Sequence, residues 1–284
     1  MRTRMLVAAA AVITGCAPAP VPQPTATGPS YVAMGDSAAA APLVPDQGQP
    51  TGCFKSTNNY PSVLARRVGA VSFTDVTCSG AQTEHLVSQQ QPTRTGPQPP
   101  QLDAVRPDTR LVTITVGVND VDLSRRAGAC RRPSLDVAPC SASFAVDGVD
   151  PLSRAIEAKA TDWAALIEAV RAKAPSARIV VVGYGTYIRP QGCFPAEPIN
   201  PVDAAYFAGK LDELQNLQQR VAADQGVEYF DPRPLSAGHD LCAAPADRYF
   251  EGFVPVNPAA PLHPNGMGAN AFGNALADYV TSRA

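Results

Sequence analysis

Five short apolar runs alternate along this chain with segments of helical periodicity. The runs cover residues 31–34, 71–76, 111–116, 178–183 and 226–230. Helices are expected at residues 60–68, 155–173, 201–224 and 266–280. Strands that are apolar throughout are buried on both faces, as in a parallel sheet between two layers of helices. We therefore expect an α/β domain of three layers, α/β/α, with a parallel sheet of about five strands.

The N-terminus has the composition of an export signal. Residues 1–4 contain two arginines, residues 5–15 are mostly apolar, and Cys16 follows directly. The apolar run is too short to cross a bilayer, which takes roughly 20 apolar residues. The sequence Ile-Thr-Gly-Cys at residues 13–16 resembles the lipobox of bacterial lipoproteins, in which the leader is removed before a cysteine that receives lipid. We expect residues 1–15 to be a lipoprotein signal peptide and Cys16 to be lipidated; the alternative is an ordinary secretory leader.

A proline-rich segment follows the leader. Residues 16–30 contain five prolines and almost no large apolar side chain. Such a segment cannot form a core, so we expect an extended tether that joins the membrane to a folded domain at residues 31–284. The mature protein is expected to be exported, either as a lipoprotein of the cell envelope or as a secreted protein.

Six cysteines follow Cys16, namely Cys53, Cys78, Cys130, Cys140, Cys193 and Cys242. An even number in an exported chain predicts disulfides. Neither a C-x-x-C pair nor an H-E-x-x-H motif is present, so we expect no metal site. Many pairings are possible, and chain order favours Cys53 with Cys78, Cys130 with Cys140, and Cys193 with Cys242.

Charge and motifs exclude several classes of protein. The formal net charge is −2, and lysine and arginine form no basic stripe, so we expect no nucleic-acid partner. Residues 266–271 match a dinucleotide fingerprint formally, but no strand precedes them, so we expect no cofactor. No Gly-x-Ser-x-Gly window occurs, which argues against the nucleophile elbow of α/β-hydrolases. The protein is expected to be a monomer.

Four positions carry the residue types that an ester hydrolase needs. Ser37 follows the first predicted strand in a Gly-Asp-Ser turn, and Gly80 and Asn119 follow the second and third strands. His263 directly precedes the last predicted helix. A serine nucleophile needs a base, and the oxyanion of its tetrahedral intermediate needs hydrogen-bond donors. We therefore expect Ser37 as nucleophile, His263 as general base, and the Gly80 amide and Asn119 side chain in an oxyanion hole.

In the order Ser, Gly, Asn, His these segments resemble the SGNH hydrolases, also called the GDSL esterase and lipase family, and particularly its secreted bacterial branch with three disulfides. Residues 53–62, 77–81, 98–102 and 238–242 also resemble that branch. The resemblance extends over residues 31–284. It implies a flavodoxin-like fold, the Ser37 amide as a third oxyanion donor, and the sequential pairing of the six cysteines.

Two positions depart from the family pattern. Ala41 stands where the family usually has glycine four residues after the serine, and could narrow the site beside Ser37. Ala260 stands where the family has an aspartate three residues before the histidine. That carboxylate normally fixes the tautomer of the imidazole and stabilises the imidazolium. We hypothesise that a backbone carbonyl in residues 256–262 orients His263 instead, with Asp240 as the alternative partner.

The two other histidines, His85 and His239, are rival bases. Only His263 is followed by Pro-Asn and a helix, so it is preferred. Two long segments without predicted secondary structure, residues 88–109 and 120–150, adjoin the third strand, and the second is the expected wall of the substrate cleft.

The positions of three aromatic residues indicate where their side chains lie. Trp163 lies on the apolar face of a predicted helix and is expected in the core. Tyr184 and Tyr187 follow the fourth strand and either line the cleft or cover apolar surface.

The sequence thus favours hydrolysis of a carboxylic ester through an acyl-Ser37 intermediate. Lipids, small esters and acyl groups on envelope glycans are all candidate substrates. An acyltransferase or a glycan deacetylase could use the same residues. A different class, a non-catalytic envelope binding protein with a degraded site, is suggested by Ala260. Loss of ester cleavage in Ser37→Ala distinguishes an enzyme from a binding protein.

Overall fold

The computed structural model describes residues 27–145 and 147–283. Its strands are β1 Gly28–Gly35, β2 Ala70–Asp75, β3 Leu111–Thr115, β4 Arg178–Val182 and β5 Glu228–Phe230. They form one sheet in the order β2-β1-β3-β4-β5, and every neighbouring pair is parallel. The expected α/β class with a five-stranded parallel sheet is confirmed.

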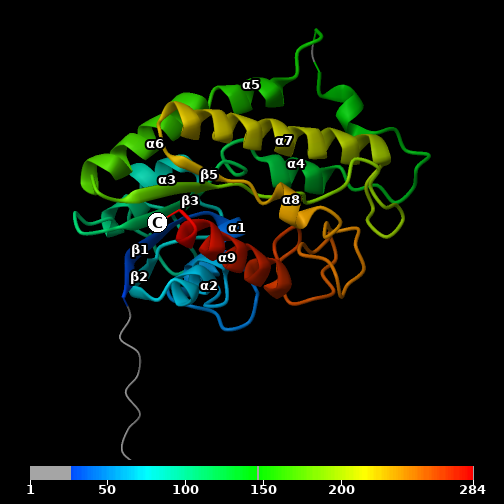
Figure 1. The fold of residues 1–284 in the computed structure, drawn as a ribbon. Helices are drawn as coiled ribbons and strands as arrows, with labels where there is room; N and C mark the ends of the chain where they lie inside the picture. Colours follow the sequence, from blue (N-terminus) through cyan, green and yellow to red (C-terminus); the bar gives the residue numbers. More distant parts are fainter. Residues whose placement is uncertain (1–26, 146, 284) are drawn as a thin grey trace, which may run out of the picture.

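Helices cover both faces of the sheet (Figure 1). On one face α2 (Tyr60–Arg67) packs against α9 (Gly266–Thr281). On the other face lie α3 (Thr83–Val87), α6 (Ala160–Lys173) and α7 (Pro201–Asp224), and α4 (Leu123–Ala129) and α5 (Pro151–Glu157) pack against α7. The remaining helices are short: α1 Ser37–Ala40, α8 Arg233–Ser236, and the 3₁₀ turns η1 Thr51–Cys53, η2 Gln101–Ala104 and η3 Cys140–Ser143.

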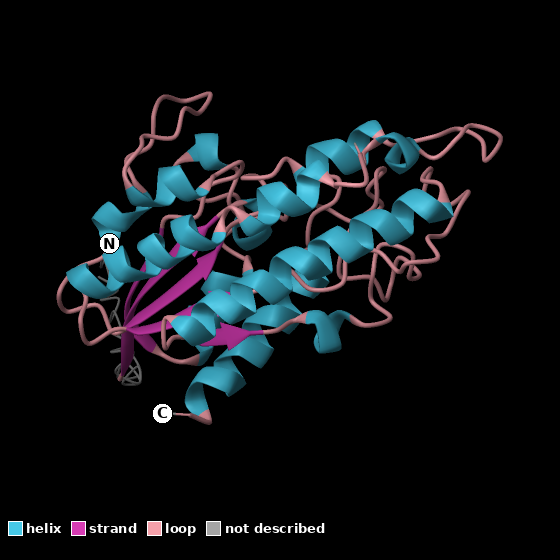
Figure 2. Ribbon diagram, turned by 90° about the horizontal axis from the view of Figure 1, so that it is seen from above, coloured by secondary structure: helices cyan, strands magenta, loops and turns pink. Residues whose placement is uncertain are grey.

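The inner strands β3 and β4 are buried as their sequence predicts, whereas the edge strand β2 has no buried residue. Every residue of β3 is buried, and four of the five residues of β4 are. Trp163 is buried on α6, as expected for a core residue. The helices on the two faces enclose the fanned strands when the molecule is seen from above (Figure 2). The carboxyl ends of the strands therefore meet at one edge, where loops can bring distant side chains together.

Three differences from the predicted elements are larger than two residues, whereas the other predicted bounds agree to within two residues. β1 begins at Gly28, so its first residues come from the segment expected as a tether. The helix expected at residues 155–173 is two helices, α5 and α6, because Asp150 caps an earlier start at Pro151 and α5 ends at Glu157. A helix, α4, lies within the segment 120–150, which showed no helical pattern.

Three disulfides link Cys53 with Cys78, Cys130 with Cys140, and Cys193 with Cys242, the pairs that chain order favoured. Each adjoins a loop at the carboxyl edge of the sheet. Within the described ranges, no helix combines the length and the apolar character needed to span a membrane.

Candidate active site

A cavity opens at the carboxyl edge of the sheet, beside Ser37 and His263. Its volume is about 90 Å³, and its wall is almost wholly apolar. The lining residues come from α1, α4, α7 and the loops after β1, β3, β4 and α8: Asp36, Ser37, Ala38, Val118, Leu123, Ser124, Ala127, Tyr184, Tyr187, Ile188, Ile199, Phe207, Leu211, Leu241, Phe253, Leu262 and His263. The segment 120–150 contributes through α4, and both Tyr184 and Tyr187 line the cavity rather than cover outer surface.

Ser37 is the first residue of α1, and only Asp36 separates it from the end of β1. Asp36 caps this helix by accepting a hydrogen bond from the Ala38 amide at 2.8 Å. Ser37 is half-buried, and its amide lies in the first helical turn, where it has no backbone acceptor among the described residues. The side chain and amide of Ser37 are therefore both available at the cavity.

The turn before Ser37 is held by Gln101, which lies on η2. The Gly35 amide donates to Gln101 Oε1 at 2.7 Å, and Gln101 Nε2 donates to the Gly35 carbonyl at 2.9 Å. A Cβ atom on Gly35 would lie 2.7 Å from the carbonyl oxygen of Thr115, so only glycine fits there. Gln101 belongs to one of the family-like segments, yet its role could not be read from the sequence.

Gly80 and Asn119 follow β2 and β3. Gly80 has a φ of +82°, which favours glycine, and its amide has no backbone acceptor among the described residues. Asn119 Nδ2 donates to the Ala81 carbonyl at 3.0 Å, which joins the two loops and leaves one of its two N–H groups for another acceptor. The side-chain Nε2 of Gln82 in turn donates to the Asn119 carbonyl at 3.0 Å. The two loops are therefore held side by side.

His263 Nδ1 lies 2.7 Å from the carbonyl oxygen of Pro261. A carbonyl only accepts hydrogen bonds, so Nδ1 carries the proton and Nε2 keeps a free lone pair. Burial lowers the pKa of His263, and the Pro261 carbonyl opposes this shift only in part. The imidazole is thus a neutral base in a defined tautomer, with its acceptor inside the segment 256–262 and no carboxylate on its N–H.

A buried carboxylate fixes the loop that carries His263. Glu251 is fully buried and accepts hydrogen bonds from the Asn265 side chain at 2.8 Å and the Val256 amide at 2.9 Å. Its own amide donates to the His263 carbonyl at 3.0 Å. Burial acts to raise the pKa of Glu251, but the hydrogen bonds from Asn265, Val256 and Asn257 outweigh it and lower the pKa. Glu251 therefore stays ionised, and its hydrogen bonds fix the chain both before His263, at Val256, and after it, at Asn265.

The other candidates for a role near His263 have different partners. Asp240 is an ion-pair partner of Arg189 at 3.1 Å and accepts from the Cys242 amide at 2.8 Å. His239 Nδ1 lies 2.6 Å from the Asp247 carbonyl, and its ring stacks on Tyr249. His85 Nδ1 accepts from the Gln82 amide at 3.0 Å. Of the three histidines, all within the described residues, only His263 lines the cavity.

Ala41, which stands where the family usually has glycine, has a backbone conformation that suits glycine. It ends α1 with φ +51° and ψ +64°, a left-handed conformation that glycine adopts without strain. Its methyl group packs in a small cluster with Val44, Ala259 and Ala269 and is not among the residues that line the cavity. The expected narrowing of the site beside Ser37 is therefore not seen. The effect of an alanine here is instead a strained left-handed backbone conformation at the end of α1.

One group of potential metal ligands occurs in the described part of the chain: Cys130, Cys140 and Asp203. The two sulfur atoms form a disulfide. The Asp203 carboxylate accepts from the amides of Cys140 and Ser141 at 3.0 and 2.8 Å. These atoms therefore serve to hold η3 against α7.

Comparison with known proteins places the chain in a family. Residues 33–271 match the model of the GDSL-like lipase/acylhydrolase family. Lipase 2 of Streptomyces coelicolor is 36% identical over 251 residues, which cover 84% of this chain and 81% of that lipase. The fold is similar to phospholipase A1 of Streptomyces albidoflavus, with a TM-score of 0.71 and 24% identity over 91% of this chain and 100% of the other. It is also similar to the extracellular lipase of Streptomyces rimosus, with a TM-score of 0.68 and 23% identity over 89% and 99% of the two chains. The chain therefore belongs to the GDSL-like lipase/acylhydrolase family and is a lipase or esterase that cleaves carboxylic esters.

Proposed function

We propose that Ser37 and His263 act as a catalytic dyad that hydrolyses esters of apolar acyl chains. His263 Nε2 takes the proton of the Ser37 hydroxyl as its oxygen attacks the ester carbonyl. The protonated imidazole then gives that proton to the departing alcohol. Water, activated in the same way, cleaves the acyl-enzyme and regenerates Ser37. The observation that carries the proposal is that His263, with its tautomer defined by Pro261, and Ser37 line one apolar cavity.

Three donors suit the oxyanion of the intermediate. The amides of Ser37 and Gly80 lack backbone acceptors in the described ranges, and the Asn119 side chain has an N–H group beyond the one used by Ala81. Removing one such donor costs about 10²- to 10³-fold in kcat in well-studied hydrolases. Among the described residues no hydrogen bond joins the Ser37 hydroxyl to His263, and such bonds often tighten only when substrate is bound.

The wall of the cavity supports an acyl chain rather than a sugar as the group held beside Ser37. The cavity is lined by the apolar side chains of Phe207, Leu211 and Leu241. Each methylene buried contributes about 0.8 kcal/mol, or roughly a factor of four in binding. A lipid or other ester with an apolar acyl chain is therefore the proposed substrate class, whereas a glycan deacetylase would need polar groups at this wall.

The protein is further proposed to act at the cell envelope through a lipid on Cys16. That residue and the whole of residues 1–15 lie outside the described residues, so the proposal depends on the lipobox-like sequence alone. Export agrees with the three disulfides, which form and persist in oxidising compartments.

The test is a series of p-nitrophenyl esters from acetyl to palmitoyl, assayed on the domain and on Ser37→Ala. Because Ser37 supplies the nucleophile, Ser37→Ala should lose at least about 10³-fold in kcat. Octanoyl esters should exceed acetyl esters by about tenfold or more in kcat/KM. The control is Ser88→Ala, an exposed serine outside the cavity. Full activity in Ser37→Ala would refute the serine mechanism, and a preference for acetyl would favour a deacetylase. Product capture by an added alcohol would identify an acyltransferase.

A further inference from the structure

The hydroxyl group of Tyr184 joins two loops of the candidate site. Tyr184 directly follows the loop residue Gly183 after β4 and is 4% exposed. Its hydroxyl donates to Asp36 Oδ2 at 2.6 Å and accepts from the Val118 amide at 3.1 Å. Burial and the neighbouring Asp36 carboxylate raise the pKa of Tyr184 well above its ordinary value, so the hydroxyl keeps its proton and can donate it to Asp36.

Both partners of this hydroxyl adjoin a residue that the mechanism uses. Asp36 directly precedes Ser37 and caps the helix that Ser37 begins. Val118 directly precedes Asn119, whose side chain is an oxyanion donor in the proposed mechanism. Tyr184 thus links the turn of the nucleophile to the turn of the Asn119 donor through a single oxygen atom. Burial raises the pKa of Asp36 to about 7, and the hydrogen bonds from Tyr184 and Ala38 hold it below what burial alone would give.

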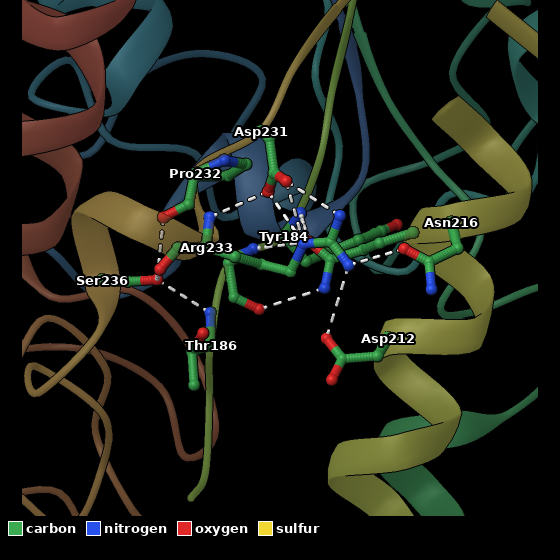
Figure 3. Close-up of polar contacts among 10 residues, drawn as sticks. Tyr184, Thr186, Asp212, Asn216, Asp231, Pro232, Arg233 and Ser236 are labelled. Carbon is green, nitrogen blue, oxygen red and sulfur yellow. Dashed lines mark hydrogen bonds and ion pairs between the residues drawn. The ribbon is translucent and has the colours of Figure 1, made fainter. Parts of the chain in front are cut away.

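The backbone that carries Tyr184 is itself fixed. Gln215, fully buried on α7, accepts from the amides of Tyr184 and Gly185 at 2.9 and 2.8 Å. The next amide, of Thr186, donates to Ser236 Oγ at 2.8 Å, and Ser236 Oγ donates to the Pro232 carbonyl at 2.9 Å (Figure 3). Two helices, α7 and α8, therefore hold this loop in place.

From this arrangement we infer that Tyr184 is a positioning residue, which sets the distance between Ser37 and the oxyanion donor of Asn119. The inference rests on the proposed roles of Ser37 and Asn119. A hydroxyl that both donates and accepts at this place has no equivalent in phenylalanine, so Tyr184→Phe leaves a buried carboxylate and a peptide N–H without their partner. Displacements of about 1 Å in a catalytic arrangement can cost about 10²-fold in rate.

The experiment compares Tyr184→Phe with Tyr31→Phe, using p-nitrophenyl octanoate. Tyr31 is a matched control, because its buried hydroxyl shares one hydrogen bond with Thr113 Oγ1 at 2.7 Å within the sheet and is not among the cavity residues. Tyr184→Phe should lower kcat by about tenfold or more with KM changed less than about twofold, because the substrate cavity keeps its apolar wall. Tyr31→Phe should lose stability while its kcat stays within about twofold. Equal kcat values in the two variants would overturn the inference.

A double-mutant cycle tests whether Tyr184 affects kcat through the turn that carries Asn119. If Tyr184 acts by placing the Asn119 turn, its loss should matter little once the Asn119 donor is removed, so Tyr184→Phe in an Asn119→Ala background should lower kcat by less than about threefold. The same tenfold loss in both backgrounds would overturn the inference. If Tyr184→Phe does not fold, Asp36→Ala breaks the same link from its other end, and unchanged kcat there would overturn it equally.

The Ser37→Ala variant distinguishes a failure of the inference about Tyr184 from a failure of the proposed function. An inactive Ser37→Ala together with a fully active Tyr184→Phe would leave the serine mechanism intact and remove only the role of Tyr184. An active Ser37→Ala would remove the proposed function and, with it, the basis of the inference.

Discussion

At the scale of single residues, the tautomer and charge of His263 determine the pH range in which the proposed dyad can act. Burial lowers the pKa of His263, so its folded-state pKa lies below the ordinary value of about 6.5. The imidazole acts as a base only when neutral, so kcat/KM should rise with pH and reach half its maximum below about pH 6.5. The measurement is a pH profile of kcat/KM with a substrate whose own ionisation does not change over this range.

Asp36 titrates near the same range, with a pKa of about 7, and must be separated from His263. The Asp36→Asn variant lacks that carboxyl and is the control for the pH profile. The rise of its kcat/KM with pH should keep the wild-type midpoint, even if the maximal kcat/KM is lower. If kcat/KM of Asp36→Asn no longer rose with pH, the wild-type profile would report the ionisation of Asp36 instead of the imidazole.

The identity of the group that orients His263 is open to direct comparison. The Pro261 carbonyl lies on Nδ1, while the Asp240 carboxylate is held by Arg189 and the Cys242 amide. We therefore expect Asp240→Asn to keep kcat within about fivefold of wild type, with some loss of stability from the altered ion pair. His263→Ala should lose about 10³-fold or more. A loss in Asp240→Asn close to that in His263→Ala would make Asp240 the partner after all.

Some residues of the candidate site could be predicted from the sequence and others could not. Ser37 and His263 stand in short motifs beside predicted elements, so their types and neighbours indicated their chemistry. Gln101 and Tyr184 act through one side chain on a partner 66 and 148 residues away, respectively. No local pattern reports such a contact, because it forms only when loops from different strands meet.

At the scale of elements, α7 both holds the loop of Tyr184 and lines the cavity. Gln215 on α7 holds the loop of Tyr184, while Phe207 and Leu211 line the cavity. The bounds of α7 could be predicted because Asn200 caps it, Pro201 opens it and apolar residues recur over its whole length. The seven-residue α4 could not, because it buries only Leu123 and has no side-chain cap. Short helices of this kind are stabilised by packing and leave little periodic signal.

The position of Leu211 leads to a prediction about acyl-chain length. A larger side chain there should fill the apolar cavity, so Leu211→Trp should lower kcat/KM for octanoyl esters by about tenfold or more and for acetyl esters by less than about threefold. Gln219→Trp is the control, since Gln219 is exposed on the same helix. Parallel losses for both esters in Leu211→Trp would show that the acyl chain binds elsewhere.

At the scale of the whole molecule, the described chain enters β1 at the end of the strand that is opposite to the cavity. The chain enters this strand at Gly28, and Ser37 follows its other end. The fold class could be predicted in full because alternating apolar strands and helices admit few arrangements other than a covered parallel sheet.

Lipidation of Cys16 makes its own prediction for the full chain in a bacterial host. Wild-type protein should take up a labelled fatty acid and fractionate with membranes, because the acylated cysteine would insert into the bilayer. Cys16→Ala should be unlabelled, while the purified domain keeps its turnover. Unlabelled wild-type protein in the medium would show instead that the leader is an ordinary secretory signal.

In the proposed mechanism Ser37 is the nucleophile and His263 is its base. The most direct measurement is the reaction of the whole chain with an alkyl fluorophosphonate, followed by mass spectrometry of the intact protein and its peptides. One adduct on Ser37 is expected, absent in Ser37→Ala and formed at least about 10²-fold more slowly in His263→Ala. An adduct on another residue, or labelling of Ser37→Ala at the wild-type rate, would contradict the claim.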